Sequence, residues 1–216
     1  MKTQELKSKI NAWAKKTIHL VYNENRDSFS KIGILPIVPP EFEWPVWNGK
    51  SLSFLMQLKF SEINPKGELP DFPTSGLMYV FYDQKQSTWG SDLQDKGSWR
   101  ILFYPETDNL KTIYRYPKDV KVRYGEEFLS PKIIKTIPAI DSDEIDTLNL
   151  DDKQWDWYCE YVDEPFDDLP AHQLGGYQSP IQGNDMDLEC QLTSNGFYAE
   201  DSESPRAKEL AKNSSD

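Results

Sequence analysis

The first part of the chain places its apolar residues at the spacing of an α-helix. The residues on one helical stripe are Leu6, Ile10, Trp13, Ala14, Thr17, Ile18 and Val21. Thr3 suits the N-cap, and Glu5 lies in the first turn, where a negative charge interacts favourably with the helix dipole. The pattern therefore predicts an amphipathic helix from Thr3 to about Tyr22 that packs by this stripe, with His19 on its exposed side.

Four later runs have the composition of β-strands: residues 51–59, 76–82, 99–104 and 120–128. Each run is bounded by Gly, Pro, Asp or Asn, the residue types that commonly end strands. The connections are too short and too poor in helical pattern for repeated βαβ crossovers, so neighbouring strands are expected to be antiparallel. We predict an α+β fold, with a mostly antiparallel β-sheet and flanking amphipathic helices in a single compact domain.

Two more helices are predicted towards the C-terminus. The spacing i, i+3, i+4 and i+7 is occupied by Trp155, Tyr158, Cys159 and Val162. This spacing predicts a helix over residues 150–162 that turns Cys159 inward and the acidic residues outward. A polar helix is expected to begin near Ser204, with Pro205 at its first position.

Residues 184–192 alternate between polar and apolar side chains, which predicts a strand. One face of this strand carries Asp185, Asp187, Glu189 and Gln191, and the other carries Met186, Leu188, Cys190 and Leu192. Carboxylates two residues apart on a strand are separated by about 7 Å, which is wide for the ligands of one ion. We therefore predict no metal here, and we expect Cys190 to behave as a small buried hydrophobe.

We expect one domain over residues 1–216, because no linker or low-complexity tract interrupts the chain. Within this domain, the pattern separates an N-terminal helix (1–27), a β-rich part (28–140), an acidic helical part (141–170) and a final part with a loop, a strand and a helix (171–216). The apolar fraction of 38% is enough for one core in a chain of 216 residues.

Charge is concentrated in the acidic helical part. The formal net charge is −12, and residues 141–168 contain twelve Asp and Glu residues but only one basic residue, Lys153. A field of this sign repels phosphate backbones, so nucleic acid is not expected as a partner. Two interpretations stay open: a solvated face that aids solubility, or a docking surface for a basic protein.

The sequence contains few residues suited to catalysis or metal binding. It has two histidines and two cysteines, no phosphate-binding Gly-rich loop and no G-x-S-x-G or H-E-x-x-H motif. We predict no cofactor and no membrane segment, and a reducing, cytoplasmic environment. Binding is favoured over catalysis. The alternative is a hydrolase that uses His172 as base with Cys190 or a carboxylate from Asp185, Asp187 or Glu189.

Four tryptophans lie in or beside predicted loops: Trp44, Trp47, Trp89 and Trp99. Burial in an aromatic core is the commoner role of tryptophan. A flat indole can also stack on a sugar or a base. A second alternative is therefore the binding of a small ligand or carbohydrate through the loops that carry Trp44 and Trp47.

A series of short motifs runs from Lys31 to Leu192. The motifs are Ile32-Gly33, Leu35-Pro36, Pro39-Pro40, Phe42-x-Trp44-Pro45, Leu52-x-Phe54-Leu55-x-Gln57-Leu58, Gly76-Leu77-x-Tyr79-x-Phe81-Tyr82-Asp83, Trp99-Arg100, His172-x-Leu174-x-Gly176, Ile181-Gln182 and Met186-x-x-Glu189-Cys190-Gln191-Leu192. Their order resembles the YwqG-like family of uncharacterised bacterial proteins. The resemblance implies an α+β fold and a cytosolic bacterial protein, and it implies no activity.

The resemblance also bears on the C-terminus and on candidate site residues. Family members continue with a second strand pair similar to residues 51–83, so we expect this chain to be shortened at its C-terminus and its sheet to lack the last strands. Polar residues of the motifs can either satisfy backbone groups at a turn or bind a cationic or hydroxyl-rich ligand. The ligand-binding candidates are His172, Gly176, Gln182, Asp185, Glu189 and Gln191, together with Trp44 and Trp47.

Overall fold

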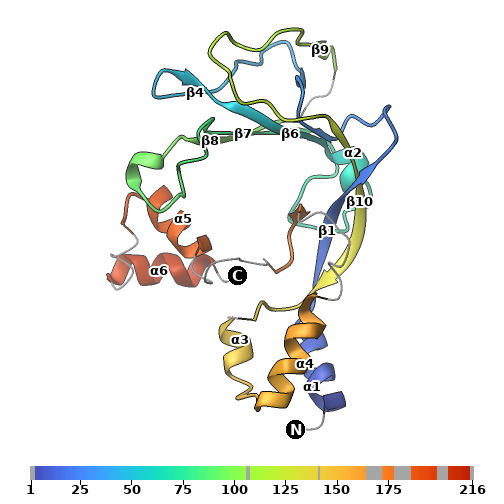
Figure 1. The fold of residues 1–216 in the computed structure, drawn as a ribbon, viewed down its shortest axis with the longest axis vertical. Helices are drawn as coiled ribbons and strands as arrows, with labels where there is room; N and C mark the ends of the chain where they lie inside the picture. Colours follow the sequence, from blue (N-terminus) through green and yellow to red (C-terminus); the bar gives the residue numbers. More distant parts are fainter. Residues whose placement is uncertain are drawn as a thin grey trace. The chain divides into compact units, whose positions relative to one another are not determined.

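The computed structural model describes residues 3–105, 108–140, 142–163, 172–177, 186–198 and 204–214. The chain forms two compact units, and each is assembled from three separate segments (Figure 1). The first unit consists of Met1–Ser30, Lys59–Ser75 and Phe128–Asn184, and the second of Lys31–Leu58, Gly76–Glu127 and Asp185–Asp216. Because the segments of the two units alternate along the sequence, no single cut divides the chain into two continuous domains. The predicted division into four successive parts stays a prediction.

The first unit is built around a long central strand. Strand β1 (Lys15–Asn23) pairs antiparallel with β10 (Glu127–Thr136) on one side and with β11 (Gln173–Leu174) on the other. On one face of β1, Ile18 and Leu20 are buried. On the other face, Thr17 and His19 are buried as well, so β1 is covered on both sides in its middle.

The predicted N-terminal helix is wrong in its second half. Helix α1 covers only Thr3–Ala12, and the chain has entered β1 by Lys15. The run from Thr17 to Tyr22 is rich in β-branched and aromatic residues, which favour a strand, and its burial on both faces removes the helical stripe. His19 is therefore fully buried rather than exposed, which corrects the second part of that prediction.

Three helices of the first unit share an apolar cluster. Helices α1, α3 (Asp143–Asp146) and α4 (Asp152–Asp163) lie together beyond one end of β1 (Figure 1). The buried members of the cluster are Leu6, Ile10, Ile137, Ile145, Tyr158 and Val162. The predicted helix over 150–162 is thus confirmed, although Cys159 is only partly buried. The Tyr158 hydroxyl donates to the carbonyl of Pro138, and burial raises the pKa of this hydroxyl.

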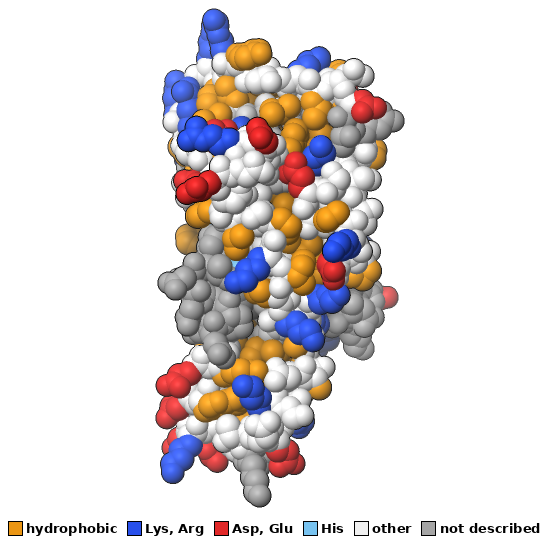
Figure 2. Space-filling model, turned by 90° about the vertical axis from the view of Figure 1, so that its right-hand side faces the viewer, with side chains coloured by type: hydrophobic (Ala, Val, Ile, Leu, Met, Phe, Trp, Pro, Cys, Tyr) orange, Lys and Arg blue, Asp and Glu red, His pale blue; other side chains and the backbone are white. Residues whose placement is uncertain are grey.

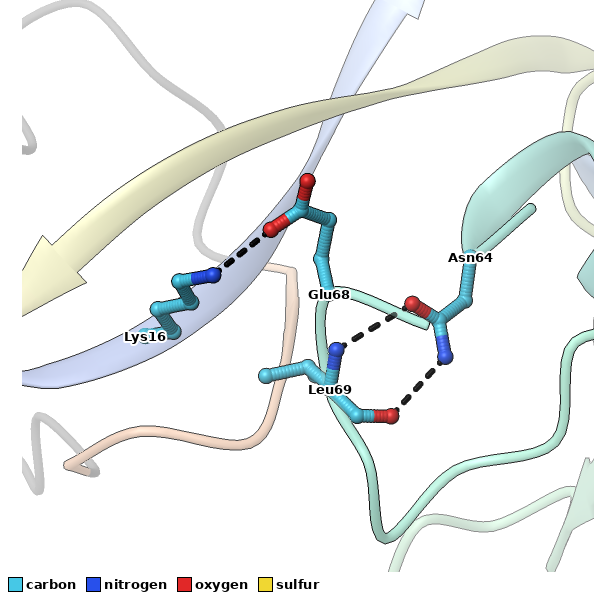
Figure 3. A network of polar contacts seen from close by, with 4 residues as sticks. All are labelled: Lys16, Asn64, Glu68 and Leu69. Atoms are coloured by element: carbon cyan, nitrogen blue, oxygen red, sulfur yellow. Dashed lines mark hydrogen bonds and ion pairs between the residues drawn. The ribbon is translucent and has the colours of Figure 1, made fainter. Parts of the chain in front are cut away.

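A buried asparagine organises the loop after helix α2 (Phe60–Ile63). The Asn64 amide donates to the Leu69 carbonyl at 2.9 Å and accepts from the Leu69 N–H at 3.2 Å, as Figure 3 shows. Next to it, Lys16 Nζ forms an ion pair of 2.7 Å with Glu68, which lowers the pKa of that carboxyl group. The reciprocal amide bonds hold Leu69 where its side chain packs against Gly175, beside β11.

The second unit contains four strands in the order β2, β6, β7 and β8. Their bounds are Lys31–Ile32, Ser53–Lys59, Leu77–Tyr82 and Trp99–Tyr104. Two small sheets accompany them: β3 (Ile37–Val38) pairs with β9 (Lys111–Thr112), and β4 (Val46–Trp47) pairs with β5 (Lys50–Ser51). The predicted strands at 51–59, 76–82 and 99–104 are confirmed, as is the α+β class with a mostly antiparallel sheet.

The predicted strand at 120–128 is wrong. Residues 120–126 are irregular, and the strand in this part of the chain is β10, which begins at Glu127. Side chains replace the ladder in the irregular stretch: Gln84 Oε1 accepts from the N–H of Lys121 at 2.6 Å, and the Ser53 hydroxyl donates to the Val122 carbonyl at 2.8 Å. Such bonds satisfy backbone groups without a strand.

Trp44 belongs to an aromatic core in the second unit. Its ring contacts Phe81 at a centroid distance of 5.4 Å, and its Nε1 donates to the Leu52 carbonyl at 2.9 Å. The other rings of this core are Phe42, Phe54, Tyr79 and Tyr116. These contacts of the indole are explained by the fold, and a ligand-binding role for Trp44 stays a prediction.

The C-terminal part of the second unit is helical. Helix α5 (Met186–Ser194) occupies the stretch that the alternation assigned to a strand, so that prediction is wrong. The stretch consists mainly of Met, Leu, Glu and Gln, which are good helix formers, and nine residues are too few for alternation to decide against them. Helix α6 (Pro205–Ser214) confirms the other prediction: it begins at Pro205, and the Ser204 hydroxyl accepts from the Ala207 N–H at 3.2 Å.

Candidate functional site

A small cavity lies within the second unit, between helix α5, the start of β8 and the loop around the 3₁₀ helix η1 (Leu93–Asp95). Its volume is about 220 Å³, and its wall is mostly apolar. The lining residues are Gly90, Asp95, Lys96, Gly97, Trp99, Arg100, Cys190, Thr193 and Ser194.

Helix α5 contributes one face to the cavity. Cys190, Thr193 and Ser194 have the spacing i, i+3 and i+4, which places them next to one another on a helix surface. The helix lies close to the opposite wall: a Cβ added at Gly90 would be 3.0 Å from Cys190 Sγ. Gly90 also has a φ of +86°, so glycine is required there for both the turn and the approach.

The loop that forms the opposite wall is fixed by two acidic side chains. Asp95 Oδ2 accepts from the N–H groups of Trp89 at 3.1 Å and Gly90 at 3.3 Å. Asp92 caps η1 by accepting from the Gln94 N–H at 2.8 Å. The wall is therefore held in shape by hydrogen bonds within the loop itself.

Two cationic side chains lie at the cavity. Lys96 Nζ donates to the carbonyl of Ser194, the last residue of α5, at 3.4 Å. Arg100 Nη1 donates to the Trp99 carbonyl at 3.0 Å. Both side chains are exposed. With the Asp95 carboxylate, the charged groups of the lining carry a formal charge of +1.

Buried hydroxyl groups around the cavity lack hydrogen-bond partners. In the described ranges, no partner is found for the hydroxyls of Thr88, Ser98 and Thr193. Thr193 lines the cavity and is only 4% exposed. Ser98 lies between two lining residues along the chain, and Thr88 comes two residues before Gly90. Burying a hydroxyl without a partner costs about 1–3 kcal/mol, so a ligand that satisfies it gains that stabilisation.

The structure places one sequence-predicted residue in the wall and another beside it. Cys190 lines the cavity, although on a helix rather than a strand. Trp47 lies behind the wall: its Nε1 donates to the Lys96 carbonyl at 3.2 Å, and its Cδ1 would lie 3.1 Å from a Cβ at Gly97. Glu189 and Gln191 are on the same helix but are not among the lining residues. Gln182 and Asp185 lie outside the described residues.

His172 and Gly176 lie in the first unit, where packing explains their positions. The His172 carbonyl accepts from the Leu20 N–H at 2.9 Å, and its Nε2 is 3.4 Å from the Tyr22 hydroxyl. At Gly176, with a φ of +77°, a Cβ would lie 1.8 Å from Thr17 Oγ1. The glycine therefore allows the chain to pass over the buried hydroxyls of β1 and β10. A ligand-binding role for either residue stays a prediction.

The proposed catalytic pair draws on both units. The two histidines of the chain, His19 and His172, belong to the first unit, and Cys190 belongs to the second. A base for Cys190 among the lining residues of its own unit would have to be a carboxylate or a lysine. The pairing of His172 with Cys190 stays a prediction.

Sequence reasoning missed most of the cavity. The sequence identifies Trp99 as one of four tryptophans in or beside loops, but Arg100 appears only in a strand and a motif, and nothing in the pattern singles out Thr193. One signal was present: Cys190, Thr193 and Ser194 form a helical triplet, which becomes visible once the stretch is read with a period of 3.6 rather than 2.

The acidic helical part presents exposed carboxylates, which we call the α3–α4 acidic surface. Its described members are Asp146, Asp151, Asp152, Asp156 and Glu160. None of these carboxylates lies within 4 Å of a Lys or Arg nitrogen in the part of the chain that the structure describes. On the face that Figure 2 shows, basic side chains also reach the surface at this helical end, so the acidic surface is interrupted.

Within the described ranges, no three His, Cys, Asp or Glu side chains converge so as to hold a metal ion. None of the helices in these ranges combines the length and the apolar composition that a membrane span requires.

Taken together, the elements define an α+β protein with an antiparallel sheet and a small, mostly apolar cavity at the end of one strand. A family model described as "Domain of unknown function (DUF1963)" matches residues 30–214, and the chain belongs to this family. The expected membership of a family of unknown function is thus confirmed, and the narrower YwqG-like name stays a prediction. Comparison with curated proteins gives no match.

Proposed function

We propose that this chain is a non-catalytic binding module and that the cavity beside β8 is its ligand site. The observation that supports the proposal is the Thr193 hydroxyl, which is buried in a mostly apolar wall with no partner among the described residues. Buried polar groups in folded proteins are nearly always satisfied. A polar atom of a bound ligand would satisfy this hydroxyl if the Thr193 side chain turns towards the cavity. The nearby Lys96 and Arg100 add groups that can orient the ligand.

Binding is favoured over catalysis because of the surroundings of Cys190. Its sulfur lies close to Gly90 in a mostly apolar wall, which suits a small hydrophobe. The hydrolase with His172 and Cys190 is kept as the alternative, and it predicts that Cys190→Ser abolishes an activity while leaving ligand binding in place.

The binding proposal is tested by screening a metabolite library for compounds that raise the melting temperature. The decisive variant is Ser194→Trp, because Ser194 is exposed and lines the cavity, so an indole there fills the mouth without disturbing the core. Asn195→Trp is the matched control, since Asn195 is the next residue, is also exposed and does not line the cavity. Compounds should stabilise the wild type and the control but not Ser194→Trp. Equal stabilisation of all three proteins, or of none, contradicts the proposal.

A second candidate function is the docking of a basic protein partner in the bacterial cytoplasm, as in toxin-immunity pairs. The observation in its favour is the α3–α4 acidic surface, whose described carboxylates are exposed and have no cationic partner. Such charges steer a basic partner towards the surface. The test is a pull-down with a variant that replaces Asp151, Asp152, Asp156 and Glu160 by Asn or Gln. Loss of a basic protein captured by the wild type supports docking, and identical capture by both proteins contradicts it.

A further inference from the structure

We infer that the cavity beside β8 binds a small monocarboxylate whose flat apolar body lies against Trp99. The inference rests on the proposed function, because it names the class of ligand for the same site. Four features of the wall lead to it: its hydrogen-bonding capacity, its charge, its apolar surface and its size.

Hydrogen-bond donors exceed acceptors in this wall. The Arg100 guanidinium has five N–H donors, and the structure uses one of them, towards the Trp99 carbonyl. The Lys96 ammonium has three, and one is used towards Ser194. The charged acceptor of the wall, Asp95, already receives two backbone N–H groups. Both of these N–H groups go to Oδ2 of Asp95. A ligand that pairs with the free donors of Arg100 and Lys96 supplies acceptor atoms, and a carboxylate supplies two oxygens that match the fork of an arginine.

The charge of the wall limits the ligand to a single negative charge. The lining carries a formal charge of +1, so a monoanion neutralises it and a dianion leaves an excess. The cavity also receives the C-terminal end of α5, at Ser194, where the helix dipole is negative. This negative helix end weakens the attraction of the wall for every anion, and it weakens it more for a phosphate dianion than for a monoanion. A carboxylate is therefore favoured over a phosphate.

The apolar part of the wall determines the body of the ligand. The Trp99 side chain is 44% exposed, which is high for an indole, and it lies beside the Cys190 thiol and the glycines of the loop. A volume of about 220 Å³ corresponds to about seven water molecules at ~30 Å³ each. That space suits one ring with a carboxyl group. An offset-stacked or edge-to-face contact with Trp99 stabilises such a ring.

The depths of the polar groups suggest how the ligand is oriented. Arg100 is exposed and Thr193 is almost fully buried, so the carboxylate is expected at the mouth and the ring in the interior. A hydroxyl group on the far side of the ring would then bond to the Thr193 hydroxyl if that side chain turns towards the cavity. This orientation predicts that 4-hydroxybenzoate binds more tightly than benzoate.

The experiment is an NMR titration of the full chain with four single-ring probes of similar size and different charge, 4-hydroxybenzoate, benzoate, 4-hydroxybenzyl alcohol and benzylamine, and with inorganic phosphate as a smaller anion. Both carboxylates should bind, and the neutral, cationic and phosphate probes should bind at least about tenfold more weakly. N-acetylphenylalanine and its amide show whether the carboxylate at the end of a peptide is accepted as well as a free acid.

Variants of two exposed arginines test the assignment of the carboxylate. Arg100→Gln should weaken benzoate binding by about tenfold or more, because a charge-assisted hydrogen bond is lost. Arg115→Gln, which changes an exposed arginine of the same unit outside the cavity, should leave binding unchanged. Arg100→Lys keeps the charge but loses the fork, so its affinity should lie between those of the wild type and Arg100→Gln.

The outcomes separate this inference from the proposed function. If the alcohol or benzylamine binds as tightly as benzoate and Ser194→Trp abolishes this binding, the cavity is a ligand site but the carboxylate inference is wrong. Equal benzoate affinity in Arg100→Gln and Arg115→Gln also overturns the inference. If Ser194→Trp changes the binding of no probe, the proposed function fails together with the inference.

Discussion

Both units bury threonine hydroxyls, but the hydroxyls differ in whether they have hydrogen-bond partners. In the first unit, Thr17 and Thr136 bond to each other at 2.8 Å, and the Tyr177 N–H donates to Thr136 at 2.8 Å. In the second unit, Thr193 is equally buried, and the described residues offer it no partner. The satisfied pair is explained by the fold, whereas the unsatisfied hydroxyl of Thr193 is the observation on which the proposed ligand site rests.

This difference changes the interpretation of the sequence motifs. The stretch from His172 to Gly176 contains two of the candidate residues chosen on residue type, and in the structure its contacts are those of a strand end packed on β1. The sequence indicates few site residues in the loop from Gly90 to Arg100, yet this loop forms one wall of the cavity. Residue type alone does not separate the two cases, because the separation depends on whether each polar group finds a partner in the fold.

The largest expected effect concerns the satisfied cluster, through Gly176→Ala. The added Cβ would lie 1.8 Å from Thr17 Oγ1 and 2.4 Å from Thr136 Oγ1, so the hydroxyl pair must separate or β11 must move. We expect a loss in the free energy of unfolding of about 3 kcal/mol or more, measured by chemical denaturation.

The control for this variant is Gly49→Ala, which isolates the cost of the backbone conformation. Gly49 has a φ of +72°, close to the +77° of Gly176, but a Cβ there meets nothing within 4 Å. Its alanine variant should cost roughly 1–2 kcal/mol, the penalty for a left-handed alanine. Equal losses in the two variants would show that the threonine cluster adjusts freely and that the close approach is unimportant.

Much of the fold could be predicted because its patterns are local. The strands at 76–82 and 99–104, helix α4 and the start of α6 at Pro205 follow from short-range periodicity and capping. Two failures have different causes. Strand β1 (Lys15–Asn23) is buried on both faces, so it lacks the alternating pattern that would identify a strand. In residues 120–126, side chains supply the hydrogen bonds that a neighbouring strand would otherwise supply.

The candidate site could be predicted only in part. Cys190 was singled out, but its neighbours Thr193 and Ser194 could not be recognised while the stretch was assigned to a strand. Trp99, Arg100 and Gly90 come together with α5 by long-range packing across about a hundred residues of sequence, which no local pattern encodes. Whether a buried hydroxyl such as that of Thr193 finds a partner depends on the whole fold.

The comparison of the two clusters is sharpened by a matched pair of variants, Thr136→Val and Thr193→Val. Thr136→Val leaves the Thr17 hydroxyl and the Tyr177 N–H without their partner, so it should lower the free energy of unfolding by about 1–3 kcal/mol. Thr193→Val removes a hydroxyl that has no partner in the described residues, so it should change stability by less than about 0.5 kcal/mol or increase it. A loss for Thr193→Val as large as that for Thr136→Val would mean that this hydroxyl is satisfied, and the main support for the cavity would disappear.

The smallest expected effect is a pH dependence that comes from His19 in the first unit. Burial lowers the pKa of this histidine, and the positive charge of Lys132 on the neighbouring strand and His172 lower it further. The folded state therefore prefers the neutral ring, while the unfolded chain takes up a proton near the ordinary pKa of 6.5. The contribution of His19 to stability should be complete above that pH and should be lost as the pH falls from there through the folded-state pKa.

Denaturation between pH 7.5 and 5.5 measures this dependence, and His19→Gln should flatten it whatever its effect on absolute stability. Lys132→Gln should weaken it, because removing the neighbouring charge raises the pKa of His19 in the folded state. Lys118→Gln, which changes an exposed lysine of the second unit, should leave the slope unchanged. A slope that survives in His19→Gln would place the titrating group elsewhere. The first unit would then owe its acid sensitivity to a group other than the buried ring on β1.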